Sequence, residues 1–259
     1  MFPYLDNGHK IPAYGVMIII AMLVCILLML FLNTHSGLKK DDKIYGASFA
    51  LVGGILGAKL LSVLISIRTI IEYNISLIDI IKNGFVFYGG LIGGAIGIVI
   101  YCKAFKVPLL RFFDAAAAVL PLGQAIGRIG CFAAGCCFGR PTDSFLGVVY
   151  HAPADPNVPV GIPLLPTQLF ESGYCMVLFI VLIALSRKER PAGVLCCIYA
   201  VGYAVARFIN EFFRYDYTRG FFLGLSTSQI ISIAIVLIVI GGLIWSRLSR
   251  RRFQRKENI

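Results

Sequence analysis

The uncharged stretch at residues 11–33, IPAYGVMIIIAMLVCILLMLFLN, decides the fold class of this chain. An α-helix needs about 20 apolar residues to cross roughly 30 Å of hydrocarbon, and this stretch is long enough. The composition agrees, because 58% of the 259 residues are hydrophobic and only 14% are charged, whereas soluble domains carry roughly 25% charged residues. We therefore predict an integral membrane protein and exclude a water-soluble globule.

Further apolar runs between charged segments predict an all-α, polytopic fold with seven transmembrane helices in one membrane-embedded domain, residues 1–259. We expect the first helix to remain as an anchor, because no basic segment precedes it and no small-residue cleavage site follows it. The expected spans are residues 12–33, 44–67, 85–102, 109–131, 168–186, 191–210 and 224–246.

Two connections between the spans are unusual. Residues 69–82, TIIEYNISLIDIIK, place isoleucines three or four positions apart, which fits a short helix in the outer interface or a simple connector. Residues 140–166 form the longest loop and are rich in proline, so we expect an irregular outer segment rather than a further domain.

The basic residues predict the orientation of the chain. Most of the 24 lysines and arginines fall on one side of the predicted spans, and that side should be cytoplasmic by the positive-inside rule. The N-terminus is then outside, and the basic C-terminal tail, residues 247–259, is inside. Topology accounts for the net charge of +11, so no nucleic-acid partner is expected. The expected cytoplasmic set is Lys39, Lys40, Lys43, Lys103, Lys106, Arg111, Arg187, Lys188, Arg190, Arg247, Arg250, Arg251, Arg252, Arg255 and Lys256.

Charged residues inside or at the ends of the predicted spans need an explanation, since each costs at least ~2.5 kcal/mol at a helix centre on insertion scales. Arginines grouped near the outer helix ends would suit a lipid phosphate, because the guanidinium fork matches phosphate oxygens. The alternative is that these arginines only neutralise nearby carboxylates. The residues concerned are Lys59, Asp114, Arg128, Glu171, Arg207, Glu211 and Arg214.

Glycines and cysteines gather in the segment GRIGCFAAGCCFG, residues 127–139. The glycines either let helices pack closely or open the helix so that backbone N–H groups face an anion. Cys131, Cys136 and Cys137 do not follow the C-x-x-C spacing, and the three histidines lie outside the spans, so we expect no metal. A disulfide or a reactive thiol remains open for these three residues.

The order of several motifs resembles that of the bacterial prolipoprotein diacylglyceryl transferase family. The signature segment at residues 114–143, DAAAAVLPLGQAIGRIGCFAAGCCFGRPTD, is similar to that family's Asp…Pro…G-R-x-G motif. Five further motifs follow the family's order along nearly the whole chain: AYGVM (13–17), FYGGLIGG (87–94), PTQLFE (166–171), YAVARFINEFFR (203–214) and LSTSQIIS (225–232).

The resemblance implies transfer of the diacylglyceryl group of phosphatidylglycerol to the lipobox cysteine thiol of a prolipoprotein signal peptide, forming a thioether and releasing glycerol phosphate. It implies no cofactor and no metal, and a location in the bacterial cytoplasmic membrane with the active site toward the outer leaflet. The residues it implies as catalytic are Arg128, Arg207, Tyr88, Tyr14 and Tyr203. Those it implies for substrate binding are Arg128, Gly127, Gly139, Gln168 and Arg214, with Asp114, Glu171 and Glu211 as their supporting partners.

The sequence departs from the family pattern at three positions. Tyr88 stands where many members have a histidine proposed as the base, Cys131 replaces an asparagine, and Leu165 replaces another histidine. A divergent paralogue that acts on another lipid or thiol acceptor is therefore an alternative. A small-solute membrane transporter and a redox-sensing membrane protein are further alternatives, although no matching half-repeats are visible in the chain.

Overall fold

The structure is a computed structural model that describes residues 4, 12–32, 36–73, 76–151, 153–215, 221–222 and 224–257. Helices dominate it, and four two-residue strands form two small antiparallel ribbons. The helices are α1 (Ala13–Phe31), α2 (Lys40–Tyr73), α3 (Leu77–Asn83), α4 (Phe87–Ala104), α5 (Leu109–Ala134), α6 (Thr167–Ser186), α7 (Val194–Glu211) and α8 (Thr227–Glu257). The strands are β1 (Val148–Val149), β2 (Pro163–Leu164), β3 (Phe221–Phe222) and β4 (Leu225–Ser226).

The prediction of a polytopic, all-helical membrane protein is confirmed. Within the described residues, six helices are long and apolar enough to cross a membrane, and the apolar part of α4, Tyr88–Ala104, is shorter. Each long helix begins within a few residues of a predicted span. Helices α2 and α8 run beyond theirs, and α8 extends the last span through the basic tail to Glu257. The side chains of that tail, residues 247–259, lie outside the described residues.

The segment between α2 and α4 contains a short helix, so the simple-connector alternative is wrong. Helix α3 begins after Ser76, whose hydroxyl accepts a hydrogen bond from the Ile78 N–H. Its end is stabilised by Lys59 of α2, whose Nζ donates to the carbonyls of Ile81 and Lys82 at 2.6 and 3.2 Å. A cation at the carboxyl end of a helix interacts favourably with its exposed carbonyls. This contact explains the lysine within the second predicted span.

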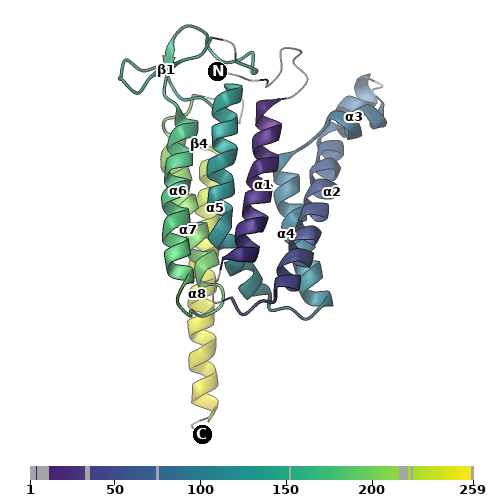
Figure 1. The fold of residues 1–259 in the computed structure, drawn as a ribbon, viewed down its shortest axis with the longest axis vertical. Coiled ribbons are helices and arrows are strands. Elements are labelled where there is room, and N and C mark those ends of the chain that lie inside the picture. Colours follow the sequence, from purple (N-terminus) through teal and green to yellow (C-terminus); the bar gives the residue numbers. More distant parts are fainter. Residues whose placement is uncertain are drawn as a thin grey trace.

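Helix α5 is the centre of the bundle. It lies between α1 on one side and α6 and α7 on the other, and α8 packs against α7, whereas α2 and α4 run together beside them (Figure 1). The buried face of α5 consists mostly of small residues, among them Ala115, Ala118, Ala125 and Gly130. Small side chains let helices approach closely, which matters in a bilayer because lipid offers no hydrophobic drive for association.

The loop at residues 140–166 has more order than the irregular segment predicted there. Helix α5 ends at Ala134, and Gly135, with a φ of 73°, turns the chain back over the helix end. Strands β1 and β2 then pair, and the loop builds its own small core around the fully buried Tyr150 and Leu164, with Phe138 and Val158. Figure 1 shows this loop above the upper ends of α5 and α6. The charged residues near these ends of α5 and α6 therefore lie beneath a loop that has its own hydrophobic core.

The α2–α4 contact depends on glycine. A Cβ at Gly57 would overlap the Gly89 carbonyl oxygen and lie 2.8 Å from the Gly93 Cα. A Cβ at Gly53 or at Gly93 would meet the backbone of the facing helix in the same way. The two helices therefore touch backbone to backbone, as expected for small residues at regular helical spacing.

We predict that Gly57→Ala lowers the thermal unfolding temperature in detergent micelles, measured by circular dichroism, because the added methyl group forces α2 and α4 apart at a cost of about 1–3 kcal/mol. Gly242→Ala in α8 is the matched control, since its Cβ would meet no heavy atom within 4 Å. The control should be neutral or slightly stabilising, because alanine favours helix over glycine by roughly 1 kcal/mol. Equal behaviour of the two variants would contradict the close packing.

Candidate functional site

Four charged side chains from three neighbouring helices, and a fifth from the segment after α7, converge near the end of the bundle that the loop at residues 140–166 covers. Helix α5 contributes an arginine from its last two turns, α6 contributes a glutamate from its second turn, and α7 contributes an arginine and a glutamate from its last two turns. A further arginine follows α7. These residues, Arg128, Glu171, Arg207, Glu211 and Arg214, are called the arginine–glutamate network below.

The network is a chain of ion pairs. Arg128 Nη2 lies 3.0 Å from Glu171 Oε1, and Arg207 Nη1 lies 3.9 Å from Glu171 Oε2. Arg207 Nη2 is 2.7 Å from Glu211 Oε2, and the same oxygen is 4.0 Å from Arg214 Nε. Each carboxylate therefore lies between two guanidinium groups, and each pair joins residues on different turns or helices.

Two neutral side chains complete the network. The Tyr203 hydroxyl of α7 donates a hydrogen bond to Glu171 Oε1 at 2.8 Å, in addition to the ion pair that this oxygen forms with Arg128. Arg207 Nη2 donates to the Ser228 hydroxyl at 3.1 Å, which ties α7 to the first turn of α8. These bonds fix the orientation of Glu171 and Arg207 before any substrate binds.

Charge and burial together indicate where an anion could enter. The network holds three guanidinium groups and two carboxylates, which leaves one positive charge in excess. The Arg128 side chain is 22% exposed, compared with 1% for Glu171, 3% for Arg214 and 8% for Arg207 and Glu211. Among the described residues, Arg207 Nη1 has no hydrogen-bond acceptor although it is buried, and such a group often marks a functional site. The alternative in which arginines only neutralise carboxylates therefore accounts for part of the network.

Asp114 does not belong to this network, so its expected role as a partner of the site arginines is wrong. It lies in the second turn of α5, and its two carboxylate oxygens accept from the backbone N–H groups of Gly193 and Cys196 at 2.7 and 2.9 Å. These groups are at the start of α7, where a carboxylate satisfies unpaired donors and favours the helix dipole. Asp114 therefore anchors α7 to α5.

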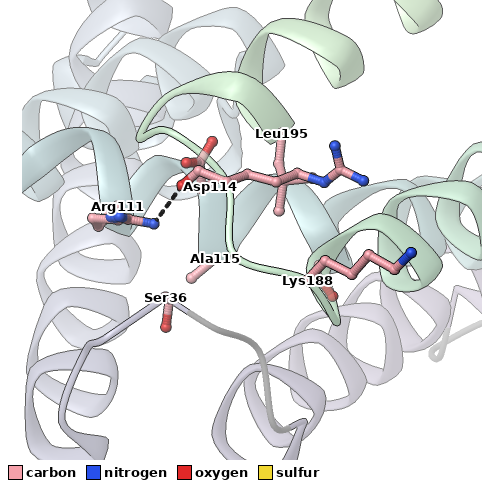
Figure 2. A pocket seen from close by; sticks show the side chains of 8 residues that line it. Ser36, Arg111, Asp114, Ala115, Lys188 and Leu195 are labelled. Carbon is pink, nitrogen blue, oxygen red and sulfur yellow. Dashed lines mark hydrogen bonds between the residues drawn. The ribbon is translucent and has the colours of Figure 1, made fainter.

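A small pocket surrounds Asp114 near the opposite end of the bundle. Figure 2 shows Arg111 near Asp114, Ser36 below, Leu195 above and Lys188 farther away at the lower right. Arg111 Nη1 donates to the Arg190 carbonyl at 2.9 Å, so this cation is already used to hold the α6–α7 connection. The pocket is thus a structural junction lined by basic residues.

Gln168 and Gly139 support the site from behind. Gln168 is fully buried, and its Nε2 donates to the Cys136 carbonyl at 2.6 Å and to the Tyr150 hydroxyl at 3.1 Å. Burial raises the pKa of Tyr150, which keeps its hydroxyl protonated. A Cβ at Gly139 would lie 2.7 Å from the Leu165 carbonyl oxygen, and Gly139 also forms a backbone bridge with Arg214. Both residues were expected to bind substrate, but in the structure their polar groups bind protein.

Gly127 belongs to the contact between α1 and α5. Helix α5 is continuous to Ala134, so its glycines do not open it toward an anion, and the packing interpretation of these glycines is confirmed. A Cβ at Gly130 would lie only 2.8 Å from the Met17 Cβ, and one at Gly127 would touch Ile18 at 3.7 Å. This close approach brings Tyr14, in the first turn of α1, within electrostatic range of Arg128 and the nearby thiols.

Tyr88 is the predicted catalytic residue that the structure does not bring to the network. It lies in the first turn of α4, is 47% exposed, and its helix packs mainly against α2. Figure 1 shows α4 on the far side of α1 and α5 from α6 and α7. The structure therefore gives no support for Tyr88 as the base.

Cys131, Cys136 and Cys137 lie beside the network, with their sulfur atoms all within 4.8 Å of one another. None of the eight cysteines forms a disulfide. Hydrogen bonds from the other two thiols lower the pKa of Cys137 below its ordinary range, and the positive charges of Arg214 and Arg128 act in the same direction. The turn at Gly135 produces this cluster, which the sequence spacing did not predict.

The start of α8 contains residues that sequence analysis missed. Ser226 and Gln229 form a reciprocal cap: the Ser226 N–H donates to Gln229 Oε1 at 3.0 Å, and the Gln229 N–H donates to the Ser226 hydroxyl at 3.2 Å. The S-x-x-Q spacing is the signature of such a capping box and could have revealed it. This cap fixes the turn that presents Ser228 to Arg207.

Comparison with known proteins identifies the family of the chain. The family profile described as prolipoprotein diacylglyceryl transferase matches residues 4–245. The chain belongs to this family. The resemblance noted from the sequence motifs is thereby confirmed, and the arginine–glutamate network, at residues 128–214, falls within the matched region.

Curated members of the family cover most of the chain. A phosphatidylglycerol–prolipoprotein diacylglyceryl transferase of Clostridium tetani is 39% identical over 231 residues, which is 89% of this chain and 91% of the relative. A protein of Clostridium perfringens with the same name followed by the number 2 is 37% identical over 96% of this chain and 95% of its own length. The Chlorobaculum tepidum transferase is 32% identical over 97% of this chain and 89% of its own length.

We predict that Glu171→Ala strongly destabilises the protein, because it leaves the buried Arg207 and the partly exposed Arg128 without their shared carboxylate, at a cost of about 3–5 kcal/mol. The matched control is Glu72→Ala, which removes the exposed Arg68–Glu72 pair and should change stability by no more than about 0.5 kcal/mol. Thermal unfolding in micelles measures both. A Glu171 variant as stable as the Glu72 variant would show that the ion pairs do not hold the helices together.

Proposed function

We propose that this protein transfers the diacylglyceryl group of phosphatidylglycerol to the lipobox cysteine of prolipoproteins. Family membership over nearly the whole chain supports this reaction class, since the relatives are named for phosphatidylglycerol and prolipoprotein. The observation in this structure that carries it is the excess positive charge of the arginine–glutamate network, with one guanidinium accessible and others buried behind it. An anionic phosphodiester that approaches through the lipid is the natural ligand for such a site.

Arg128 is the residue proposed to bind the phosphoglycerol headgroup. It is the most exposed member of the network, and its single close carboxylate partner, Glu171, leaves other guanidinium donors for a phosphate oxygen. The Glu171 carboxylate also holds Arg128 in one orientation. This preorganisation reduces the entropy lost when the headgroup binds.

Arg207 is the residue proposed to stabilise the leaving phosphate. In the reaction, the acceptor sulfur forms a bond to the glyceryl carbon while the bond from that carbon to the phosphate oxygen breaks, and the electron pair stays on that oxygen. The thiol proton must leave before or during this step. The Nη1 atom of Arg207 is buried and has no hydrogen-bond acceptor among the described residues. It is therefore suited to stabilise this growing negative charge.

The remaining predicted residues have supporting roles in this proposal. Tyr203, Glu211 and Arg214 hold Glu171 and Arg207 in position. Tyr14, on α1 beside α5, lies within electrostatic range of Arg128 and is proposed to help bind the headgroup. Tyr88 on α4 would need a movement of the α2–α4 pair to reach the reacting atoms.

We further propose seven membrane spans, with α4 as the shortest, an outer N-terminus and an active site facing the outer side of the bacterial cytoplasmic membrane. The network and the connection between α6 and α7, with Arg187, Lys188 and Arg190, lie at opposite ends of the same helices. The positive-inside rule places that connection in the cytoplasm and therefore the network at the outer surface.

This topology predicts opposite protease accessibility for two exposed loop residues. A protease site inserted at Asn157, in the outer loop, should be cut in intact spheroplasts, whereas the same site inserted at Glu189 should be cut only after the membrane is opened. Immunoblotting of the fragments measures the result. Cleavage at Glu189 in intact spheroplasts would reverse the proposed orientation.

Activity is tested with purified protein, phosphatidylglycerol and a lipobox peptide, with mass spectrometry of the peptide cysteine. We predict that Arg128→Ala lowers the transfer rate by at least about a hundredfold, because it removes donors from the phosphate. Arg128→Lys should recover part of the rate, since lysine keeps the charge but not the planar fork. Arg68→Ala, which removes an exposed arginine of α2, is the matched control and should transfer normally. A normal rate for Arg128→Ala would overturn the proposed role of this residue.

A second candidate, a paralogue that modifies another thiol or lipid acceptor, rests on Cys131 at the position where the family motif has asparagine. This substitution changes the group next to Arg128. The same assay separates the two functions. Binding of phosphatidylglycerol without modification of the peptide would favour the other acceptor.

A further inference from the structure

Three cysteine side chains form a cluster that the transfer mechanism above does not use. Cys131 lies in the last turn of α5, and the left-handed turn at Gly135 brings the next residues back over the helix end. The sulfur atoms of Cys131, Cys136 and Cys137 are consequently all within 4.8 Å of one another. Since one is buried and the other two are half-buried, the cluster lies at the edge of the protein core.

The backbone that carries these thiols is held rigidly. Thr167 Oγ1 donates to the Cys137 carbonyl at 2.8 Å, and Gln168 Nε2 donates to the Cys136 carbonyl at 2.6 Å. Both donors come from the first turn of α6. Cys137 also has a positive φ of 64°, which is unusual for a residue with a side chain. Strained backbone that surrounding contacts enforce is concentrated at functional sites.

The donor set selects the kind of ligand. Thiolates prefer soft or borderline metal ions such as Zn²⁺ and Cu⁺ to the oxygen-seeking Mg²⁺ and Ca²⁺. With Zn–S bonds of about 2.3 Å, tetrahedral geometry separates the sulfur atoms by about 3.8 Å. The present separations of the sulfur atoms, all within 4.8 Å, exceed that value by about 1 Å at most.

The charges around the cluster favour thiolates. The Cys137 side chain interacts with the Arg214 guanidinium, and Cys131 lies within electrostatic range of Arg128. Three thiolates and Zn²⁺ carry a net charge of −1, which these guanidinium groups stabilise. A disulfide is uncharged, so neighbouring cations would not stabilise it.

We propose that Cys131, Cys136 and Cys137 form a three-thiolate zinc site whose fourth position takes an incoming thiol. Zinc held by three protein ligands keeps its fourth tetrahedral position for water or substrate. A thiol that replaces that water is bound as thiolate and releases its proton to solvent, because zinc deprotonates a coordinating thiol. This second part rests on the proposed function, in which the acceptor is a cysteine that must lose a proton close to Arg128.

Metal content tests the first part without lipid or peptide. The full chain, produced with zinc and purified without a metal-affinity tag, should contain about one zinc per chain by plasma mass spectrometry. Cys131→Ser and Cys137→Ser should each lower the zinc content at least tenfold. Cys197→Ser, a half-buried cysteine of α7 outside the cluster, is the matched control and should retain full zinc.

Three results would overturn the zinc site: wild-type protein with no more zinc than the Cys131 variant, copper in place of zinc, or a mass two units lower that indicates a disulfide. Co²⁺ exchange into the wild type gives a check that no variant's folding can affect, since three sulfur ligands should produce strong tetrahedral visible bands. Weak, octahedral-type bands would equally contradict the proposal.

The fourth position is tested on the Co²⁺ protein with a lipobox peptide and the same peptide carrying serine in place of cysteine. The cysteine peptide should shift the visible bands and the serine peptide should not. Equal spectra would exclude the thiol ligand while leaving the metal result intact. Because transfer is assayed separately, failure of the zinc site and failure of the proposed transferase activity are distinguishable.

Discussion

The buried carboxylate of Glu171 is the group on which the packing of the central helices depends. Glu171 Oε1 pairs with Arg128 of α5 and accepts a hydrogen bond from the Tyr203 hydroxyl of α7. Glu171 Oε2 pairs with Arg207. A charge that is only 1% exposed is tolerated in an apolar surrounding only when opposite charges and hydrogen bonds compensate it. The three helices must therefore stay in register, and that register places the guanidinium groups together.

The two halves of the bundle are held together by different forces. Helices α5, α6 and α7 share charged and hydrogen-bonded groups, whereas α2 and α4 meet through glycine, with backbone against backbone. In lipid, apolar side chains gain little by leaving the bilayer for a helix contact, so close packing and buried polar contacts are the main sources of association. The network of fixed charges therefore belongs to the α5–α7 half of the bundle.

The first turn of α6 connects the arginine–glutamate network to the cysteine cluster. The first turn of α6 carries Thr167 and Gln168, which bind the backbone of the cysteine turn, and one turn later it carries Glu171. The backbone bridge from Gly139 to Arg214 adds the end of α7 to the same unit. The cysteine turn, the start of α6 and the end of α7 are therefore joined by hydrogen bonds into one unit beside the arginines.

The sequence by itself determined the helical membrane fold, the approximate start of each long helix and the residues of the network, because hydropathy, buried charge and motif order are local properties of the chain. It could not determine the partner of Asp114, which caps α7 near the other end of the bundle, or the supporting roles of Gln168 and Gly139. It also missed the proximity of Cys131 to Cys136 and Cys137. These contacts join groups that are separated along the chain, and the turn at Gly135 and the packing of neighbouring helices bring them together. Only the tertiary structure decides which of these groups meet.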